Sequence, residues 1–247
     1  MLLKLKRRFF LITSKHPTPM LKKLSLVGLL SVAGLLSHSA LAVTKTVDST
    51  TLVNGYMNVF NLPADGGSYQ FGSSWGTQDL SSNFSNSSTV TLGVNSVNDP
   101  ASYWYIPSGG PGAAGNKIME ANLYAESTVT GLGDTTLTFN GTVLANSLDG
   151  AHSVVAFIRD FAPDFSSFNG QTVALTPGDF SVTLALTNDP ARHVQYGFTM
   201  TGPNVWITDA AAAGTVTVTA VPEPSSFALI GAAIAGLFAV TSRRRRA

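Results

Sequence analysis

Serine, histidine and carboxylate side chains are the groups of this sequence that could catalyse a reaction. The segment Gly72-Ser73-Ser74-Trp75-Gly76 matches the G-x-S-x-G pattern, in which the central serine is a nucleophile. That chemistry needs a strand before the serine and a helix after it. Residues 78–88 are rich in Ser and Asn and lack a helical pattern. We therefore expect a turn with a partly buried Trp75, and no nucleophile at Ser74.

Histidines and paired carboxylates give no stronger catalytic pattern. His152 and His193 are the histidines of the central region, and neither has the spacing of a metal site, so we expect both at strand ends or on the surface. Glu120 and Glu126 lie in one expected strand, which places them on one face about 20 Å apart. The carboxylates of a glycosidase stand only about 5–10 Å apart. We therefore predict no catalytic residues and a protein that is not an enzyme.

Acidic and amide side chains in the loops leave two interpretations open. The segments Asn95-Ser96-Val97-Asn98-Asp99 and Asn188-Asp189 supply oxygen atoms of the kind that bind Ca²⁺. Ordinary Asx turns use the same residue types. We expect no cofactor and no metal site, with calcium as the alternative. Asp160 is expected to pair with Arg159 or to cap a turn.

An aromatic cluster suggests a different chemistry, the stacking of rings on sugars. Tyr103, Trp104 and Tyr105 are consecutive and fall in an expected strand, so the two tyrosines share one face and the tryptophan takes the other. Exposed rings of this cluster could bind a glycan, with help from Trp75 and Trp206. Packing in the core and at its rim is the alternative.

The charge of the chain is divided unevenly along its length. Of 247 residues, none is cysteine, which excludes disulfides and thiol catalysis. Residues 1–42 hold seven basic residues and no acid, whereas residues 43–220 hold four basic and thirteen acidic residues, a net charge of −9. Nucleic acids and anionic membranes demand Lys and Arg, so we exclude them as partners of the central region.

The elements that must position these side chains are strands. Residues 43–220 consist of short β-branched or aromatic runs between turn residues, without helical stretches. This pattern predicts an all-β fold, an antiparallel β-sandwich of the jelly-roll kind. Asn140-Gly141 is either a hairpin turn or a kink in one long strand, and we favour the strand. The expected strands are Thr51–Phe60, Ser68–Ser73, Thr89–Val94, Ser102–Ile106, Lys117–Thr128, Thr135–Leu144, Ser153–Arg159, Thr172–Thr176, Phe180–Thr187, Val194–Thr201 and Thr215–Thr219.

The first 42 residues have the anatomy of a secretory signal peptide. Lys22-Lys23 precedes an apolar run, Leu24–Leu36, and the small residues Ala40 and Ala42 follow it. We predict a signal helix that enters the Sec translocon and cleavage by signal peptidase after Ala42. A lasting transmembrane anchor is the alternative. Met20 is an alternative start, since it begins a signal peptide of ordinary length.

The last 27 residues combine three features in fixed order. The stiff tripeptide Pro222-Glu223-Pro224 comes first. The uncharged apolar run Phe227–Val240 follows, and Arg243, Arg244, Arg245 and Arg246 end it. The basic block would stay on the cytoplasmic side of a membrane. The run is short for a full span, but it shows no polar face, so we predict a C-terminal transmembrane helix over a core helix.

This order of features resembles the PEP-CTERM sorting signal of exported proteins in Gram-negative bacteria that make exopolysaccharide. The resemblance implies that a membrane-embedded protease, an exosortase, recognises residues 221–247 and cuts near Pro222-Glu223-Pro224. The segments Asp149–Phe161 and Gln195–Thr199 resemble β-sandwich modules of such exported proteins. Some of those modules resemble carbohydrate-binding domains, but this likeness implies no ligand residues here.

Taken together, these features predict a non-catalytic exported protein with a β-sandwich domain at residues 43–220. We expect it to pass through the inner membrane and then to reach the cell surface or the extracellular matrix. A structural or adhesive role in a biofilm or exopolysaccharide matrix is the leading interpretation. A carbohydrate-binding module is the alternative, and a secreted hydrolase is the third.

The processing events predict a definite mass. We expect the protein from the extracellular fraction of its host to begin at Val43 and to end near Pro222-Glu223-Pro224. Intact-mass spectrometry measures both ends at once. A mass that still includes Arg243 to Arg246 would mean that the tail is a lasting anchor.

Overall fold

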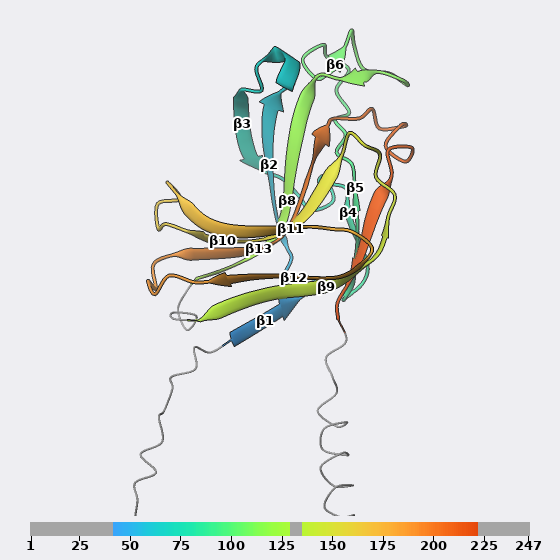
Figure 1. Cartoon of the computed structure of the whole chain (residues 1–247). Coiled ribbons are helices and arrows are strands. Elements are labelled where there is room, and N and C mark those ends of the chain that lie inside the picture. The colour runs from blue at the N-terminus through green and yellow to red at the C-terminus, as the bar shows by residue number, and fades with distance from the viewer. Residues whose placement is uncertain (1–41, 129–134, 222–247) are drawn as a thin grey trace, which may run out of the picture. The chain divides into compact units, whose positions relative to one another are not determined.

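The computed structural model describes residues 42–128 and 135–221, and these residues form an all-β fold (Figure 1). The predicted signal helix, the sorting motif and the C-terminal helix lie outside the described residues. Within those residues, no helix has the length and apolar character needed to cross a membrane. The helical content there is one short 3-10 turn, Pro63–Asp65. The prediction of an all-β class is therefore confirmed.

Twelve strands form two six-stranded sheets. We call the first sheet A and the second sheet B. Sheet A contains β1 (Ala42–Thr46), β4 (Ser82–Asn86), β5 (Thr89–Gly93), β9 (Thr136–Asn146), β12 (Gly178–Ala185) and β14 (Thr215–Thr219). Sheet B has the order β11 (Phe168–Ala174), β10 (Ser153–Phe161), β13 (His193–Pro203), β8 (Lys117–Thr128), β2 (Asn54–Asn61) and β3 (Tyr69–Ser74). The pair β6 (Tyr105–Ile106) and β7 (Ala114–Gly115) forms a small separate ribbon.

Strand β9 is the centre of sheet A. Along one edge it pairs with β12, while β1 and then β14 share its other edge. The pairing of β1 with β9 is parallel, whereas the other pairs among the described strands are antiparallel. The prediction of a purely antiparallel fold was therefore wrong at this edge. The reason is that β14 occupies only part of the edge and leaves the rest to β1.

The chain crosses repeatedly between the two sheets. Strands β5, β9, β12 and β14 are in sheet A, and β8, the consecutive pair β10 and β11, and β13 come between them in the sequence and are in sheet B. Strands β2, β3 and β4 extend the two sheets at their ends.

One hydrophobic core joins the inner faces of the two sheets. Phe139 of β9 is fully buried, and its ring centroid lies 5.3 Å from that of Phe198 on β13 and 5.7 Å from that of Phe180 on β12. Strand β12 alternates regularly, because Phe180, Val182 and Leu184 are buried while their neighbours are exposed. Gly141 leaves room for this packing, since a Cβ there would lie 2.6 Å from the ring of Phe180. The chain runs through Asn140-Gly141 as one strand, as we favoured.

Two of the sequence-based boundaries were wrong. The expected strand Ser102–Ile106 is mostly a turn, because the backbone N–H groups of Trp104 and Tyr105 both donate to the carbonyl of Ala101. Conversely, the polar stretch at residues 81–88 contains β4, which pairs with β5. Its polar residues are tolerated because most of them face solvent at the edge of sheet A.

A buried ion pair fastens the loop after β12 to strand β10. Asp160 is fully buried, and its Oδ1 accepts a hydrogen bond of 2.7 Å from Nε of Arg192. Its Oδ2 accepts a bond of 2.9 Å from the backbone N–H of Thr187. The expected pairing of Asp160 with Arg159 was wrong, because successive residues of a strand point to opposite faces of the sheet.

Substitution of Arg192 tests how much its ion pair compensates the burial of the Asp160 carboxylate. We expect Arg192→Met to lower the free energy of unfolding by about 3–5 kcal/mol, because it leaves the Asp160 carboxylate buried without a cation. Chemical denaturation of the purified chain measures the loss. The exposed cation Lys45 gives a matched control, since Lys45→Met should change stability by no more than about 0.5 kcal/mol. Equal losses in the two variants would contradict the prediction.

Candidate functional site

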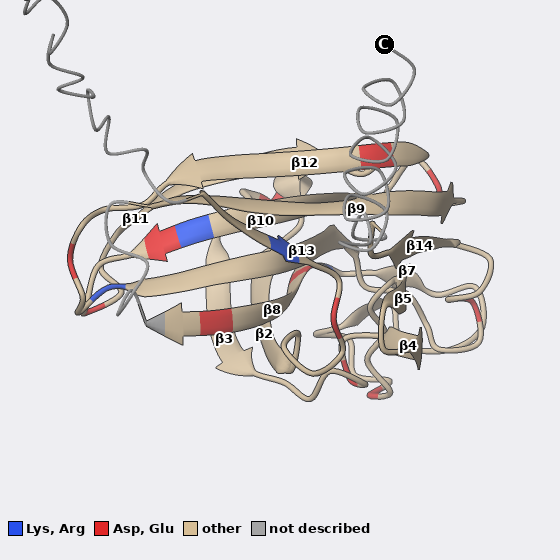
Figure 2. Ribbon diagram, turned by 90° about the horizontal axis from the view of Figure 1, so that it is seen from below, with Lys and Arg blue, Asp and Glu red and all other residues tan. Residues whose placement is uncertain are grey.

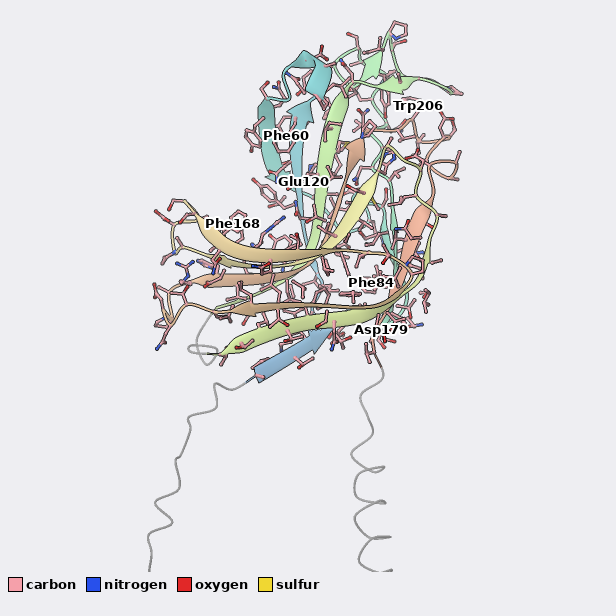
Figure 3. All side chains as sticks on the ribbon, viewed as in Figure 1. Phe60, Phe84, Glu120, Phe168, Asp179 and Trp206 are labelled. Atoms are coloured by element: carbon pink, nitrogen blue, oxygen red, sulfur yellow. The ribbon has the colours of Figure 1, made fainter. Side chains whose placement is uncertain are left out.

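The outer face of sheet B, opposite the core, carries a cleft of about 500 Å³. Aromatic rings, carboxylates, amides and one guanidinium share its walls. Strands β2, β3, β8, β10, β11 and β13 and the loop between β10 and β11 all contribute. The lining residues are Tyr56, Asn58, Ser74, Glu120, Asn122, Tyr124, Glu126, Arg159, Phe161, Phe165, Phe168 and Gln195. Figure 3 labels two of them, Glu120 and Phe168, on different strands of the sheet.

The alternation of strand β8 explains why so many polar groups meet here. Its apolar residues Met119, Ala121, Leu123 and Ala125 are buried in the core. The residues between them, Glu120, Asn122, Tyr124 and Glu126, therefore point to the outer face and line the cleft. The neighbouring strands continue this division between core and cleft.

A glycine lets the strands approach closely at the floor of the cleft. Gly197 on β13 stands opposite Tyr124 on β8 and Phe157 on β10. A Cβ at this position would collide with the backbone oxygen of Leu123. The side chain of Phe157 is fully buried, although the alternation of β10 places it on the outer face. Sheet B is strongly curved, and in Figure 1 β2 and β3 run across the direction of β10 and β11.

Arg159 is the cation of the cleft, and it is held in place by neutral partners. Its Nη1 donates to Oδ1 of Asn122 at 2.9 Å, and its Nη2 donates to the hydroxyl of Thr199 at 3.3 Å. The guanidinium carbon lies 4.0 Å from the ring centroid of Phe157, a cation–π contact. Burial lowers the pKa of Arg159, and the nearby charge of Glu120 opposes that change. The group stays protonated at physiological pH because its ordinary pKa is so high.

The two carboxylates of the cleft accept hydrogen bonds from amides. Oε1 of Glu120 accepts a bond of 3.0 Å from Nδ2 of Asn58. Oε2 of Glu126 accepts a bond of 2.6 Å from Nε2 of Gln195. Between them, burial raises the pKa of Tyr124, and the negative charge of Glu126 raises it further. Hydrogen bonds thus fix both carboxylates in position, and the charge of Glu126 raises the pKa of Tyr124.

Three phenylalanines form an aromatic wall at the β10–β11 end of the cleft. The ring centroid of Phe161 lies 5.5 Å from that of Phe165 and 5.0 Å from that of Phe168. Phe165 has a left-handed backbone, with φ of 57°, and its ring stacks on His193 at 4.3 Å. Phe165 and Phe168 are 49% and 56% exposed, so part of each ring remains open to a ligand even though one face of Phe165 is covered by His193.

The predicted aromatic cluster does not form one exposed patch. Tyr105 is fully buried, and its hydroxyl donates to the carbonyl of Val97 at 2.6 Å. Trp104 is partly buried and packs edge-on against Phe71. Tyr103 is 41% exposed, and Nζ of Lys117 lies 4.4 Å from its ring centroid. Tyr105 therefore has no free face for a sugar, and the physical reason is the turn that replaced the expected strand.

Trp75 and Trp206, the expected helpers of that cluster, also pack within the fold. Nε1 of Trp75 donates to the hydroxyl of Ser73 at 3.0 Å, and its ring packs against the core. The ring of Trp206 stands edge-on to Tyr105, with centroids 5.2 Å apart.

The serine and the histidines have separate surroundings. Ser74 ends β3 and is followed by a turn at residues 77–81, so no helix follows it as a nucleophile elbow would need. It lines the cleft instead, a position that the G-x-S-x-G pattern did not indicate. His193 lies 3.5 Å from Oε1 of Glu126 through its Nδ1.

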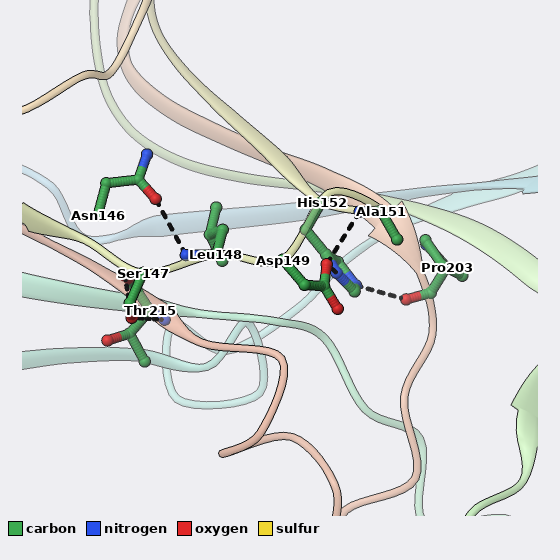
Figure 4. Close-up of polar contacts among 8 residues, drawn as sticks. All are labelled: Asn146, Ser147, Leu148, Asp149, Ala151, His152, Pro203 and Thr215. Carbon is green, nitrogen blue, oxygen red and sulfur yellow. Dashed lines mark hydrogen bonds and ion pairs between the residues drawn. The ribbon is translucent and has the colours of Figure 1, made fainter.

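His152 is a structural residue near the end of β13. Its Nδ1 lies 2.7 Å from Oδ1 of Asp149, and its Nε2 lies 3.0 Å from the carbonyl oxygen of Pro203 (Figure 4). Hydrogen bonds from His152, together with one from the backbone of Ala151, lower the pKa of Asp149. The side chain of His152 is 3% exposed, so it fastens the turn before β10 to β13.

Two of the candidate calcium ligands form Asx turns. Oδ1 of Asp99 accepts the backbone N–H of Ala101 at 2.9 Å, and Oδ1 of Asp189 accepts that of Ala191 at 3.0 Å. Across the described part of the chain, no group of three or more His, Cys, Asp or Glu side chains is placed to hold a metal ion. Acidic residues are spread over strands and loops of the domain (Figure 2).

Comparison with known families identifies a sorting motif near the C-terminus. Residues 220–246 match the PEP-CTERM protein-sorting motif. The chain carries this motif. The motif indicates an exported protein that transits the membrane and is processed by an exosortase, as the C-terminal features predicted. No curated protein and no solved structure shows significant similarity to the chain.

Sequence reasoning missed the cleft because its members are dispersed. Glu120 and Glu126 were considered as a catalytic pair, whereas Arg159, Tyr124 and Phe168 attracted no prediction of binding. The alternation of β8 was a usable signal, because it places four polar residues in a row on the face opposite the core. No local signal indicates that β11 lies near them.

The pKa of Tyr124 offers a test of the cleft's electrostatics. We expect Glu126→Gln to lower this pKa, because it removes a negative charge that disfavours the phenolate. The pKa should stay above its ordinary value, since burial is the larger cause. Titration of ¹³C-labelled tyrosine by NMR measures it. Asp179→Asn, on β12 of sheet A, is the control that should leave it unchanged, and an equal change in both variants would contradict this arrangement.

Proposed function

We propose that this chain is a non-catalytic, exported protein that holds extracellular polysaccharide in the sheet B cleft. In this proposal an exosortase releases it, and it acts as a structural or adhesive component of a biofilm or exopolysaccharide matrix. Its exported domain is a jelly-roll sandwich over residues 43–220. The observation that carries the proposal is a cleft whose walls combine open aromatic faces with fixed hydrogen-bonding groups.

The junction between the domain and the sorting motif suits release of a folded protein. Strand β14 ends at Thr219, and the backbone N–H of Ala220 donates to the carbonyl of Ser88 at 2.8 Å. A cut near Pro222 would leave every described strand intact. In this proposal, the C-terminal segment holds the protein briefly in the inner membrane. The cut then releases the folded domain to the surface.

The chemistry of the cleft suits a sugar. Phe168 and Phe165 offer exposed ring faces, on which the apolar face of a sugar can stack. Glu120 and Arg159 offer an acceptor and a donor for hydroxyl groups. Ligand sites generally combine apolar walls with a few fixed polar groups of this kind.

The absence of catalysis is part of the proposal. A glycosidase acts through two carboxylates held about 5–10 Å apart. Glu120 and Glu126 stand six residues apart along β8, a separation of about 20 Å in an extended strand. Both are engaged by amides, which supports a binding role over a catalytic one.

Aromatic substitutions test the binding site directly. We expect Phe168→Ala with Tyr124→Ala to weaken binding to the host's own exopolysaccharide roughly tenfold, because about 1.4 kcal/mol of stacking is lost. Co-sedimentation and calorimetry with the purified polysaccharide measure the loss. Tyr103→Ala is the matched control, since Tyr103 is exposed but lies outside the cleft.

The control also separates the two sites considered for the sugar. A loss with Tyr103→Ala but none with the cleft variant would place the sugar at the aromatic cluster of the sequence analysis. Unchanged binding in both variants would leave a purely structural role in the matrix.

A further inference from the structure

Several polar groups of the cleft make no hydrogen bond to another residue of the described part of the chain. Among the described residues, none donates a hydrogen bond to Oε2 of Glu120, and the hydroxyls of Tyr56 and Tyr124 make no hydrogen bond. Arg159 uses two of its five N–H donors, one toward Asn122 and one toward Thr199. These groups are free to meet a ligand.

Asn122 holds the two charged groups of the floor at a fixed separation. Its Nδ2 donates to Oε1 of Glu120 at 3.4 Å, while its Oδ1 accepts from Arg159 at 2.9 Å. The hydroxyl of Thr199 also donates to this oxygen, at 2.7 Å. Within the described residues Glu120 and Arg159 form no ion pair, although the charge of Glu120 partly offsets the lowering of the Arg159 pKa by burial. The floor therefore presents an acceptor and a donor side by side, with a neutral amide between them.

We infer that the cleft selects a neutral sugar and rejects acidic polysaccharides. In this arrangement, one hydroxyl of a vicinal diol donates to Oε2 of Glu120 and its neighbour accepts from an N–H of Arg159. Glu120 is then the residue that determines specificity. The inference rests on the proposed function, since it names the class of glycan that the same cleft takes.

The charges around the site support a neutral ligand. Among the described lining residues, Glu120 and Glu126 are acidic and Arg159 is the one cation, and residues 43–220 carry a net charge of −9. A uronate carboxylate would meet like charges on approach and again in the cleft. An ammonium group would not meet this repulsion, so the selection acts against acidic sugars.

Three oligosaccharides of equal length test this selectivity. The probes are a neutral glucose oligomer, the corresponding glucuronate oligomer and the corresponding glucosamine oligomer, each titrated by calorimetry into the chain recovered from the host's extracellular fraction. We expect the neutral oligomer to bind at least tenfold more tightly than the glucuronate oligomer, and the glucosamine oligomer, which carries no negative charge, also to bind more tightly than the glucuronate oligomer. Glu120→Gln should weaken binding of the neutral oligomer at least fivefold. It should also reduce the ratio of the affinity for the neutral oligomer to the affinity for the glucuronate oligomer.

Two further variants keep the test independent of folding. Asp179→Asn removes one acidic charge from sheet A and should leave all three affinities unchanged. Tyr56→Phe removes only a hydroxyl that makes no hydrogen bond among the described residues, so it should preserve the melting temperature and weaken binding of the neutral oligomer about threefold or more. It replaces Glu120→Gln if that variant unfolds.

The outcomes separate this inference from the proposed function. Binding of the glucuronate oligomer as tightly as the neutral or the glucosamine oligomer would overturn the inference and leave glycan binding standing. Unchanged neutral binding in both Glu120→Gln and Tyr56→Phe would also overturn it. If no oligomer and no host polysaccharide binds, the proposed function itself fails.

Discussion

The register of strand β8 is the constraint on which both the core and the cleft depend. Its side chains alternate between the space shared by the two sheets and the outer face of sheet B. A slip of one residue would place Glu120 and Glu126 in the core and expose Met119 and Leu123. Burial of the apolar residues of β8 therefore also fixes the positions of its polar residues. No additional interaction is needed to bring these polar residues to the cleft.

Two charged side chains of sheet B, Asp160 and Arg159, are compensated in different ways. On the inner side, Asp160 is fully buried and is compensated by a cation, Arg192, together with a backbone N–H. On the outer side, Arg159 is compensated by neutral oxygens of Asn122 and Thr199. The first arrangement satisfies its charge within the protein and serves stability. The second leaves donors free, which is the condition for binding a ligand.

Two glycines and one turn determine how closely the strands pack and which aromatic rings are buried. Gly197 allows β8 and β13 to approach, and Gly141 admits the ring of Phe180 to the core. The turn at residues 101–104 buries Tyr105 and separates it from Tyr103. Sequence alternation predicted these last two residues on one face, but alternation holds only where the chain is extended.

The sequence by itself determined the all-β class, most of the strand positions and the sorting motif at residues 220–246. These features are local, since period-two alternation and a terminal motif are visible within a short window. Only the tertiary structure decided the cleft, because Tyr56, Glu120, Arg159 and Phe168 come from four strands, of which only β10 and β11 are consecutive along the chain. It also decided the partner of Asp160 and the parallel pairing of β1. Such contacts depend on which strands become neighbours after the chain has crossed between the sheets, and no local pattern records that order.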